Sequence, residues 1–264
     1  MSNTSKQQSF YLDFATVVGP FLAIFAIAFT VSLENDSPPS LLNLPSLVLV
    51  VGGTLGATMV AYPLKTFIRL PIIIWQAFKV EKNDPKIHIE LMVKLADKTR
   101  KSGLLGLEDD LPKIDDLFTR NALTLLIDGF PGEELLSVLG NDNEMTAQRH
   151  NVYIKMLDVM AGFAPAMGMM GTVVGLIGVM GNLSDPSQLG PSVSIAFLTT
   201  LYGSLLSNLV LIPLANKLKH KNEEEMFIRE LIIEGVLAVH EGENPRIVRQ
   251  KMEIFLSPSL RVLQ

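Results

Sequence analysis

Charged residues are missing from four long stretches of this chain, and this absence constrains the fold more than any motif. The stretches are Phe14–Leu33, Ser37–Leu64, Val159–Ser184 and Pro186–Asn216. Each is mostly apolar and long enough to supply the ~20 residues with which a helix crosses a hydrocarbon core. Because a backbone in lipid must satisfy its own hydrogen bonds, we expect an all-α integral membrane protein with four transmembrane helices.

The basic residues predict how these helices are oriented. All 22 Lys and Arg residues lie before the first stretch, between the second and third, or after the fourth. The two short connections, Glu34–Ser40 and Leu183–Gly190, contain none. Basic residues collect in cytoplasmic loops, so both termini and the long middle segment are predicted to be cytoplasmic.

The expected organisation alternates membrane and cytoplasmic parts. The parts are 1–64 (transmembrane helices at about 14–33 and 44–63), 65–158 (a cytoplasmic helical domain), 159–216 (transmembrane helices at about 159–182 and 191–215) and 217–264 (C-terminal cytoplasmic helices). Gly- and Pro-containing runs predict breaks at Asp128–Gly132 and Gly242–Pro245. The amphipathic stretch Leu64–Val80 fits either an interfacial helix or an extension of the second span.

Composition excludes several classes of function. The chain has no cysteine, which removes disulfides, thiolate metal sites and cysteine nucleophiles. Its four histidines are scattered, without the spacing of a metalloprotease helix, and no Gly-rich phosphate-binding loop is present. We therefore predict neither an enzyme nor a bound cofactor.

Glycines recur at three- and four-residue steps in the third stretch, namely at Gly168, Gly171, Gly175 and Gly178. Such spacing places them on one face of a helix. In lipid, small-residue faces let two helix backbones approach closely. The row therefore predicts helix packing, which by itself implies no further function.

Hydroxyl and proline residues mark the same two stretches. Thr172 lies in the third, and Thr199 and Thr200 lie in the fourth. Their oxygens suit a partly dehydrated hard cation, although a threonine in a membrane helix often only bonds its own i−4 carbonyl. Pro165 removes the helical partner of the Ala161 carbonyl.

None of the four stretches contains an Asp or Glu. An ion-coupled membrane machine usually needs an ionisable group inside the membrane. If this chain conducts H⁺ or Na⁺, a second polypeptide must therefore supply the carboxylate.

Several runs resemble the MotA/PomA family of flagellar stator subunits, and the resemblance covers nearly the whole chain. The run Ala164–Leu176 resembles the family's third span, and Gly190-Pro191 with Leu198–Gly203 and Leu206–Asn208 resembles the fourth. The tail Glu234–Ala238 with Gly242–Arg246 is similar to its C-terminal signature. Leu95–Asp97, Arg100–Gly103 and Leu107-Glu108 resemble its rotor-facing loop.

The resemblance implies a homopentameric ring around a dimer of a MotB/PomB-type partner in the bacterial inner membrane. The partner's single span would carry the ion-binding Asp, and ion flow would turn the ring against the rotor protein FliG. The matching positions have three implied roles. They are Pro165 and Pro191 for coupling, Thr172, Thr200 and Thr199 for Na⁺ selection (Thr172 and Thr200 as transient Na⁺ ligands), and Arg100, Lys101, Glu108 and Asp109 for rotor contact.

Three alternatives follow from the same residues. The first concerns the ion: the threonines favour Na⁺ over H⁺. However, Gly162 stands where the family's Na⁺ branch usually has an Asp, and the nearest acidic residue is Asp158. An ExbB/TolQ-like motor subunit energising a cell-envelope process would keep the ring and change the partner. A passive membrane scaffold would be held together by the glycine face and would not depend on an ion.

Overall fold

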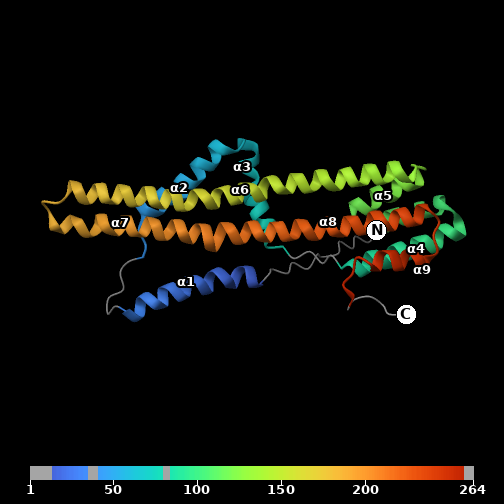
Figure 1. The fold of residues 1–264 in the computed structure, drawn as a ribbon, viewed down its shortest axis with the longest axis horizontal. Helices are drawn as coiled ribbons and strands as arrows, with labels where there is room; N and C mark the ends of the chain where they lie inside the picture. Colours follow the sequence, from blue (N-terminus) through green and yellow to red (C-terminus); the bar gives the residue numbers. More distant parts are fainter. Residues whose placement is uncertain (1–13, 35–40, 80–83, 259–264) are drawn as a thin grey trace, which may run out of the picture. The chain divides into compact units, whose positions relative to one another are not determined.

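The computed structural model describes residues 14–34, 41–79 and 84–258, and nearly all of these residues are helical (Figure 1). The elements are α1 (Phe14–Glu34), α2 (Leu44–Ala61), α3 (Leu64–Ala77), α4 (Pro85–Ser102), the 3₁₀ helix η1 (Leu104–Lys113), α5 (Leu117–Ile127), α6 (Gly132–Gly181), α7 (Pro186–Leu205), the π-helix η2 (Leu206–Leu211), α8 (Ile212–His240) and α9 (Pro245–Glu253). The predicted turn after the first span falls at residues 35–40, outside the described residues.

The predicted breaks fall between helices. α5 ends at Ile127 and α6 begins at Gly132, while α8 ends at His240 and α9 begins at Pro245. α2 ends at Ala61 and α3 begins after Pro63 as a separate helix, so the stretch after the second span does not simply continue it.

The longest helix, α6, runs for 50 residues without interruption. Its polar stretch 141–148 is helical. The predicted third span is thus the C-terminal part of a longer helix. The predicted fourth span likewise continues from α7 through η2 into α8.

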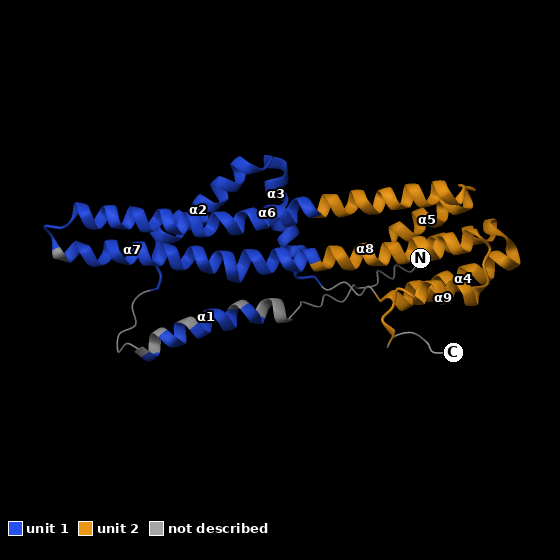
Figure 2. Ribbon diagram, in the orientation of Figure 1, with its two compact units in different colours: residues 1–81, 151–219 blue, residues 82–150, 220–264 orange. Residues whose placement is uncertain are grey.

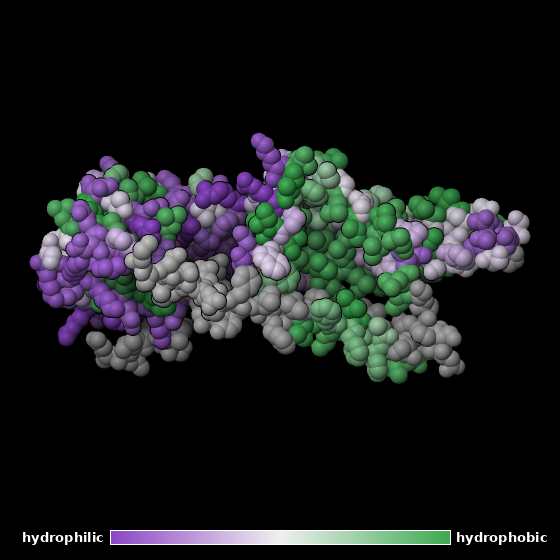
Figure 3. Space-filling view, turned by 180° about the vertical axis from the view of Figure 1, so that it is seen from behind, coloured by the Kyte–Doolittle hydropathy of each residue, from purple (hydrophilic) through white to green (hydrophobic). Residues whose placement is uncertain are grey.

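The chain divides into two compact units, coloured separately in Figure 2. Unit 1 comprises residues 1–81 and 151–219, and unit 2 comprises residues 82–150 and 220–264. Figure 3 shows hydrophobic residues covering much of the visible surface of unit 1 and hydrophilic residues covering much of unit 2. Among the described residues, three helical segments are long and apolar enough to cross a membrane: Leu44–Ala61, Gly132–Gly181 and Ser187–His240.

Unit 1 has a small core in which α3 packs against the larger helices. Leu70 and Ala77 of α3 are buried in a cluster with Met156, Leu157 and residues of η2 and α8. A second face of α3 exposes Leu64, Ile68, Ile72 and Trp75 at three- and four-residue steps. A helix that buries one apolar face and exposes another is suited to lie along a membrane surface.

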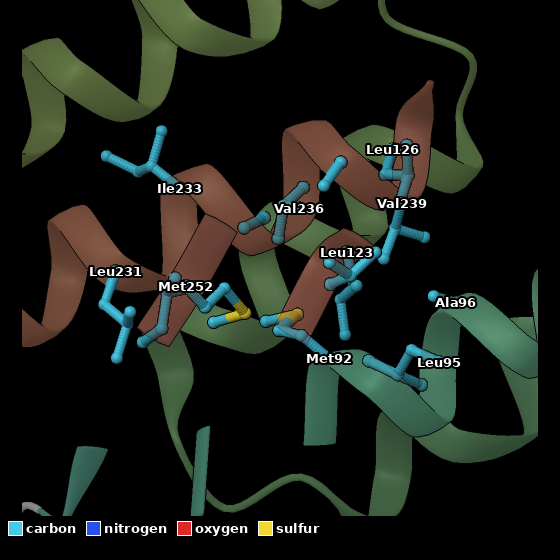
Figure 4. Packing of buried hydrophobic residues seen from close by; sticks show 14 of the residues in the cluster. Met92, Leu95, Ala96, Leu123, Leu126, Leu231, Ile233, Val236, Val239 and Met252 are labelled. Atoms are coloured by element: carbon cyan, nitrogen blue, oxygen red, sulfur yellow. The ribbon is translucent and has the colours of Figure 1, made fainter. Parts of the chain in front are cut away.

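Unit 2 has a larger hydrophobic core, shown in Figure 4. Met92 of α4, Leu123 of α5, Val236 of α8 and Met252 of α9 are fully buried there. A Cβ atom added to Gly235 would lie 2.6 Å from Met92 Cγ and 2.9 Å from Met252 Cε. A glycine at this position therefore lets α8 approach α4 and α9 closely.

Candidate functional site

The glycine row of α6 forms a close-packed seam with α7. A Cβ atom added to Gly168 would lie 2.9 Å from the Thr199 carbonyl oxygen, and one added to Gly175 would lie 2.7 Å from Ala196 Cβ. At Gly171 it would meet Cγ2 of Thr199 at 2.5 Å, and at Gly178 it would meet Ser192 Oγ at 3.1 Å. All four glycines thus face α7.

The seam continues on α7 in a residue that the sequence analysis did not assign to it. A Cβ atom added to Gly203 would lie 2.6 Å from the Ala164 carbonyl oxygen. Ala196, Thr199, Gly203 and Ser207 follow one another at three- and four-residue steps, so the same spacing rule applied to α7 would have found this face.

Thr172 and Thr200 come together at the edge of this seam. Their Oγ1 atoms are 2.6 Å apart, and Thr172 also donates towards the Ala196 carbonyl at 3.1 Å and the Gly168 carbonyl at 3.2 Å. Thr200 Oγ1 lies 3.4 Å from the same Ala196 carbonyl. Two hydroxyl and two carbonyl oxygens therefore converge, and Thr200 is exposed in the isolated chain.

Thr199 behaves differently from its neighbour. Its side chain is fully buried (0% exposed), and its hydroxyl bonds the Ile195 and Ala196 carbonyls of its own helix at 3.0 Å each. Thr54 and Thr58 of α2 do the same with carbonyls four residues earlier. Thr199 therefore packs against Gly171, whereas Thr172 and Thr200 present oxygen atoms that a further ligand could share.

Pro165 lies inside α6 and has no N–H to donate to the Ala161 carbonyl. This carbonyl accepts a hydrogen bond from another helix instead. Ser207 Oγ donates to the Ala161 carbonyl at 2.7 Å, in a fully buried position. Pro191, the second predicted coupling proline, lies near the start of α7 and is exposed. Pro165 lies against Gly203, whereas Ser192, next to Pro191, lies against Gly178, so the two prolines belong to different levels of the seam.

Tyr202 joins the seam to α2. Its hydroxyl accepts the backbone N–H of Asn43 at 2.9 Å and donates to the Leu41 carbonyl. Asn43 in turn caps α2, because its Oδ1 accepts the N–H of Ser46 at 3.0 Å. Sequence reasoning could not assign these contacts of Tyr202, because the partners lie about 160 residues away and carry no motif.

In unit 2, the four charged residues predicted to meet the rotor are all exposed. Arg100 and Lys101 lie in the last turn of α4, and Glu108 and Asp109 lie in η1 just beyond it. Gly103 connects the two elements with φ +73°, a conformation that favours glycine. Both pairs of charges are therefore displayed around one turn.

Ion pairs distinguish these charges from each other. Lys101 pairs with Asp97 at 2.5 Å, whereas Arg100, Glu108 and Asp109 have no ion pair within the described residues. Asp110, next to them, bonds Lys98 at 2.5 Å and Lys113 at 2.8 Å. The hydrogen bond from Lys113, followed by that from Lys98, lowers the pKa of Asp110. Asp110 is therefore a carboxylate, and its bond to Lys98 connects η1 to α4.

The described residues contain no group of three or more His, Cys, Asp or Glu side chains placed to hold a metal ion. The cluster at Thr172 and Thr200 instead brings together hydroxyl and carbonyl oxygens, a ligand type that suits a hard cation. It also contains no carboxylate, so a stable cation site would need a further negative group from elsewhere.

Comparison with known proteins bears on this arrangement. The sequence profile of the MotA/TolQ/ExbB proton channel family matches residues 110–231. Motility protein A of Treponema phagedenis is 38% identical, over 94% of this chain and 95% of its own length. Chemotaxis protein PomA of Vibrio alginolyticus is 33% identical, over 96% of this chain and 99% of its own.

A solved structure agrees with these relatives. A chain of the flagellar MotAB stator complex from Bacillus subtilis matches with a TM-score of 0.86 and 31% identity, over 92% of this chain and 96% of that chain. Helices long and apolar enough to cross a membrane, together with the match to the MotA/TolQ/ExbB proton channel family, indicate a membrane protein of that class. Within that class, the chain belongs to the MotA/PomA family of flagellar stator subunits.

Proposed function

We propose that this chain is the ring-forming subunit of an ion-driven flagellar stator, with Na⁺ as the favoured ion and H⁺ as the alternative. The observation that carries the proposal is the Thr172–Thr200 hydroxyl pair, 2.6 Å apart and at an exposed edge of the α6–α7 seam. A Na⁺ ion must exchange its hydration shell for oxygen ligands, whereas a proton needs only an ionisable group and a water path.

The lack of a membrane carboxylate supports a one-span MotB/PomB-type partner that carries the ion-binding Asp. The relative solved as part of a MotAB stator complex is consistent with such a partner. In this proposal, the partner's Asp lies against the Thr172–Thr200 edge and completes the set of oxygens around the ion.

We further propose the membrane arrangement and assembly that the sequence predicted. α1, α2, the C-terminal part of α6 and α7 with η2 would cross the bacterial inner membrane, with both termini in the cytoplasm. Five copies would surround two partner chains. The ring would press on FliG through Arg100, Lys101, Glu108 and Asp109, because exposed charges form and release contacts quickly.

The full-length relatives favour this function over an ExbB/TolQ-like one. The family profile includes TolQ and ExbB proteins, but the relatives described above match along nearly the whole chain and are named for motility or chemotaxis. Restoration of swimming in a stator-deleted host, by this chain together with a MotB-type partner, tests the proposal. Failure to restore swimming despite normal membrane insertion of both chains would count against it.

A further inference from the structure

The inference concerns the hydrogen bond between Ser207 and the Ala161 carbonyl. Pro165 has no N–H, so the carbonyl four residues earlier loses the donor that an uninterrupted helix would provide. Ser207 Oγ supplies that donor from another helix at 2.7 Å. Both residues are buried, Ser207 being 3% and Ala161 5% exposed, so no water can take the place of the hydroxyl without rearrangement.

Ser207 reaches this carbonyl from an irregular part of its own helix. It lies in η2, where the N–H of Ile212 bonds the Ser207 carbonyl in the i→i+5 pattern of a π-helix. Pro213 follows directly and removes the donor for the carbonyl of Leu209. π-Helical segments are rare, and those that occur are frequently found at functional sites.

The two helices also approach each other closely near these irregular places. Gly203, one turn before Ser207, leaves room for the Ala164 carbonyl, which a Cβ atom would approach to 2.6 Å. The Thr172–Thr200 pair lies two turns further along α6 from Pro165. The proposed ion contact and the Ser207 bond are thus on one helix pair, within unit 1.

We propose that Ser207 is a positioning residue for coupling: its hydroxyl replaces the hydrogen bond that Pro165 removes and holds α6, at its interrupted point, against η2. The inference rests on the proposed stator function and on the coupling role that the family resemblance implies for Pro165. A displacement of α6 relative to α7 at the threonine pair must then either carry η2 along or break this bond. Ser207 thereby passes movement from the ion contact to the start of α8.

A double-mutant cycle tests the contact without requiring ion flow. The thermal unfolding midpoint is measured for the full chain purified with its MotB-type partner. Ser207→Ala should lower the midpoint by roughly 2–4 °C, as expected for the loss of one buried hydrogen bond. In a Pro165→Ala background the same change should cost much less, because residue 165 then donates its own N–H to Ala161. Equal losses in both backgrounds would overturn the inference.

Ser204→Ala is the matched control, since Ser204 lies one turn earlier on the same helix and is exposed. It should leave the midpoint unchanged. The pair Ser207→Thr and Ser207→Val covers the case in which the alanine variant does not assemble, because Thr and Val have nearly the same shape and only Thr has a hydroxyl. The threonine variant should be the more stable, and equal stability would overturn the inference.

Motility separates positioning from ion binding. Ser207→Val should lower the maximal swimming speed severalfold while leaving the half-saturating ion concentration unchanged, and Ser207→Thr should restore much of the speed. A shift in half-saturating concentration with unchanged maximal speed would contradict a positioning role. If no variant responds to either ion, the stator proposal fails, whereas the stability cycle still decides whether the contact exists.

Discussion

The hydroxyl oxygens of Thr172 on α6 and Thr200 on α7 lie 2.6 Å apart, and both are directed towards the carbonyl oxygen of Ala196. Thr199, only one residue before Thr200, points into the glycine seam and is satisfied by its own helix. A helix turns by about 100° per residue, so adjacent threonines acquire different roles. Thr199 packs inside the seam, and Thr200 pairs with Thr172 at its exposed edge.

Replacing Thr200 tests this distinction. Thr200→Val keeps the shape and removes the hydroxyl, so the half-saturating Na⁺ concentration for swimming should rise roughly fivefold, the equivalent of about 1 kcal/mol for one oxygen contact. Thr58→Val is the control, because the Thr58 hydroxyl bonds only the Thr54 carbonyl of its own helix. Equal effects of the two substitutions would remove Thr200 from the ion's route.

The glycine seam predicts opposite results for two glycines of α6. Gly171→Ala forces a Cβ atom against Thr199 and should lower the stability of the complex by roughly 1–3 kcal/mol. Gly162→Ala has nothing within 4 Å of its added Cβ atom and should be neutral or stabilise the helix by about 0.5–1 kcal/mol. Thermal unfolding and the size of the assembled complex measure both. Equal stability of the two variants would contradict a close-packed seam.

The charged turn of unit 2 predicts a functional effect without a folding effect. Arg100 is exposed and has no ion pair within the described residues, so Arg100→Glu should reduce swimming speed while leaving the thermal unfolding midpoint within about 1 °C. Reversing a complementary acidic residue on the rotor should restore part of the speed. Lys94→Glu, an exposed charge further back on α4, should leave swimming normal. If both reversals slow swimming equally, the contact is not located at this turn.

His88 predicts a pH dependence of unit 2. Burial lowers its pKa, against the raising influence of Asp116 and Asp84. Below the ordinary histidine pKa of about 6.5, the unfolded chain binds the proton more readily than the folded one. Stability should therefore be complete above that pH and fall as the pH drops from 7.5 to 5.5. His88→Gln should flatten this dependence of the unfolding midpoint. An unchanged pH profile in His88→Gln would exclude His88 as the cause.

Much of the fold follows from the sequence, because lipid imposes simple rules. Runs without charge predicted the apolar helices, and Gly- and Pro-containing runs at 128–132 and 242–245 predicted two helix boundaries that are confirmed. The polar stretch 141–148 is helical, and it contains no glycine or proline that would interrupt a helix.

The candidate site was only partly predictable. Spacing predicted a glycine face on α6, but the angle between two helices decides whether Thr199 or Thr200 meets Thr172, and no local pattern reports that angle. Pro165 indicated that the Ala161 carbonyl needs a donor, yet its donor Ser207 is 46 residues away. Ser207 reaches this carbonyl from the π-helix η2, and the feature of the nearby sequence that indicates a helix irregularity is Pro213.

An ion titration tests the central claim most directly. Swimming speed is measured in a stator-deleted host that carries this chain and its MotB-type partner, with Na⁺ exchanged for K⁺ at constant pH and ionic strength. The account predicts that speed rises with Na⁺ and saturates, and that Thr200→Val shifts the half-saturating concentration upwards. Speed that is indifferent to Na⁺ and abolished by a protonophore would contradict the sodium assignment and leave the threonine pair a role in packing alone.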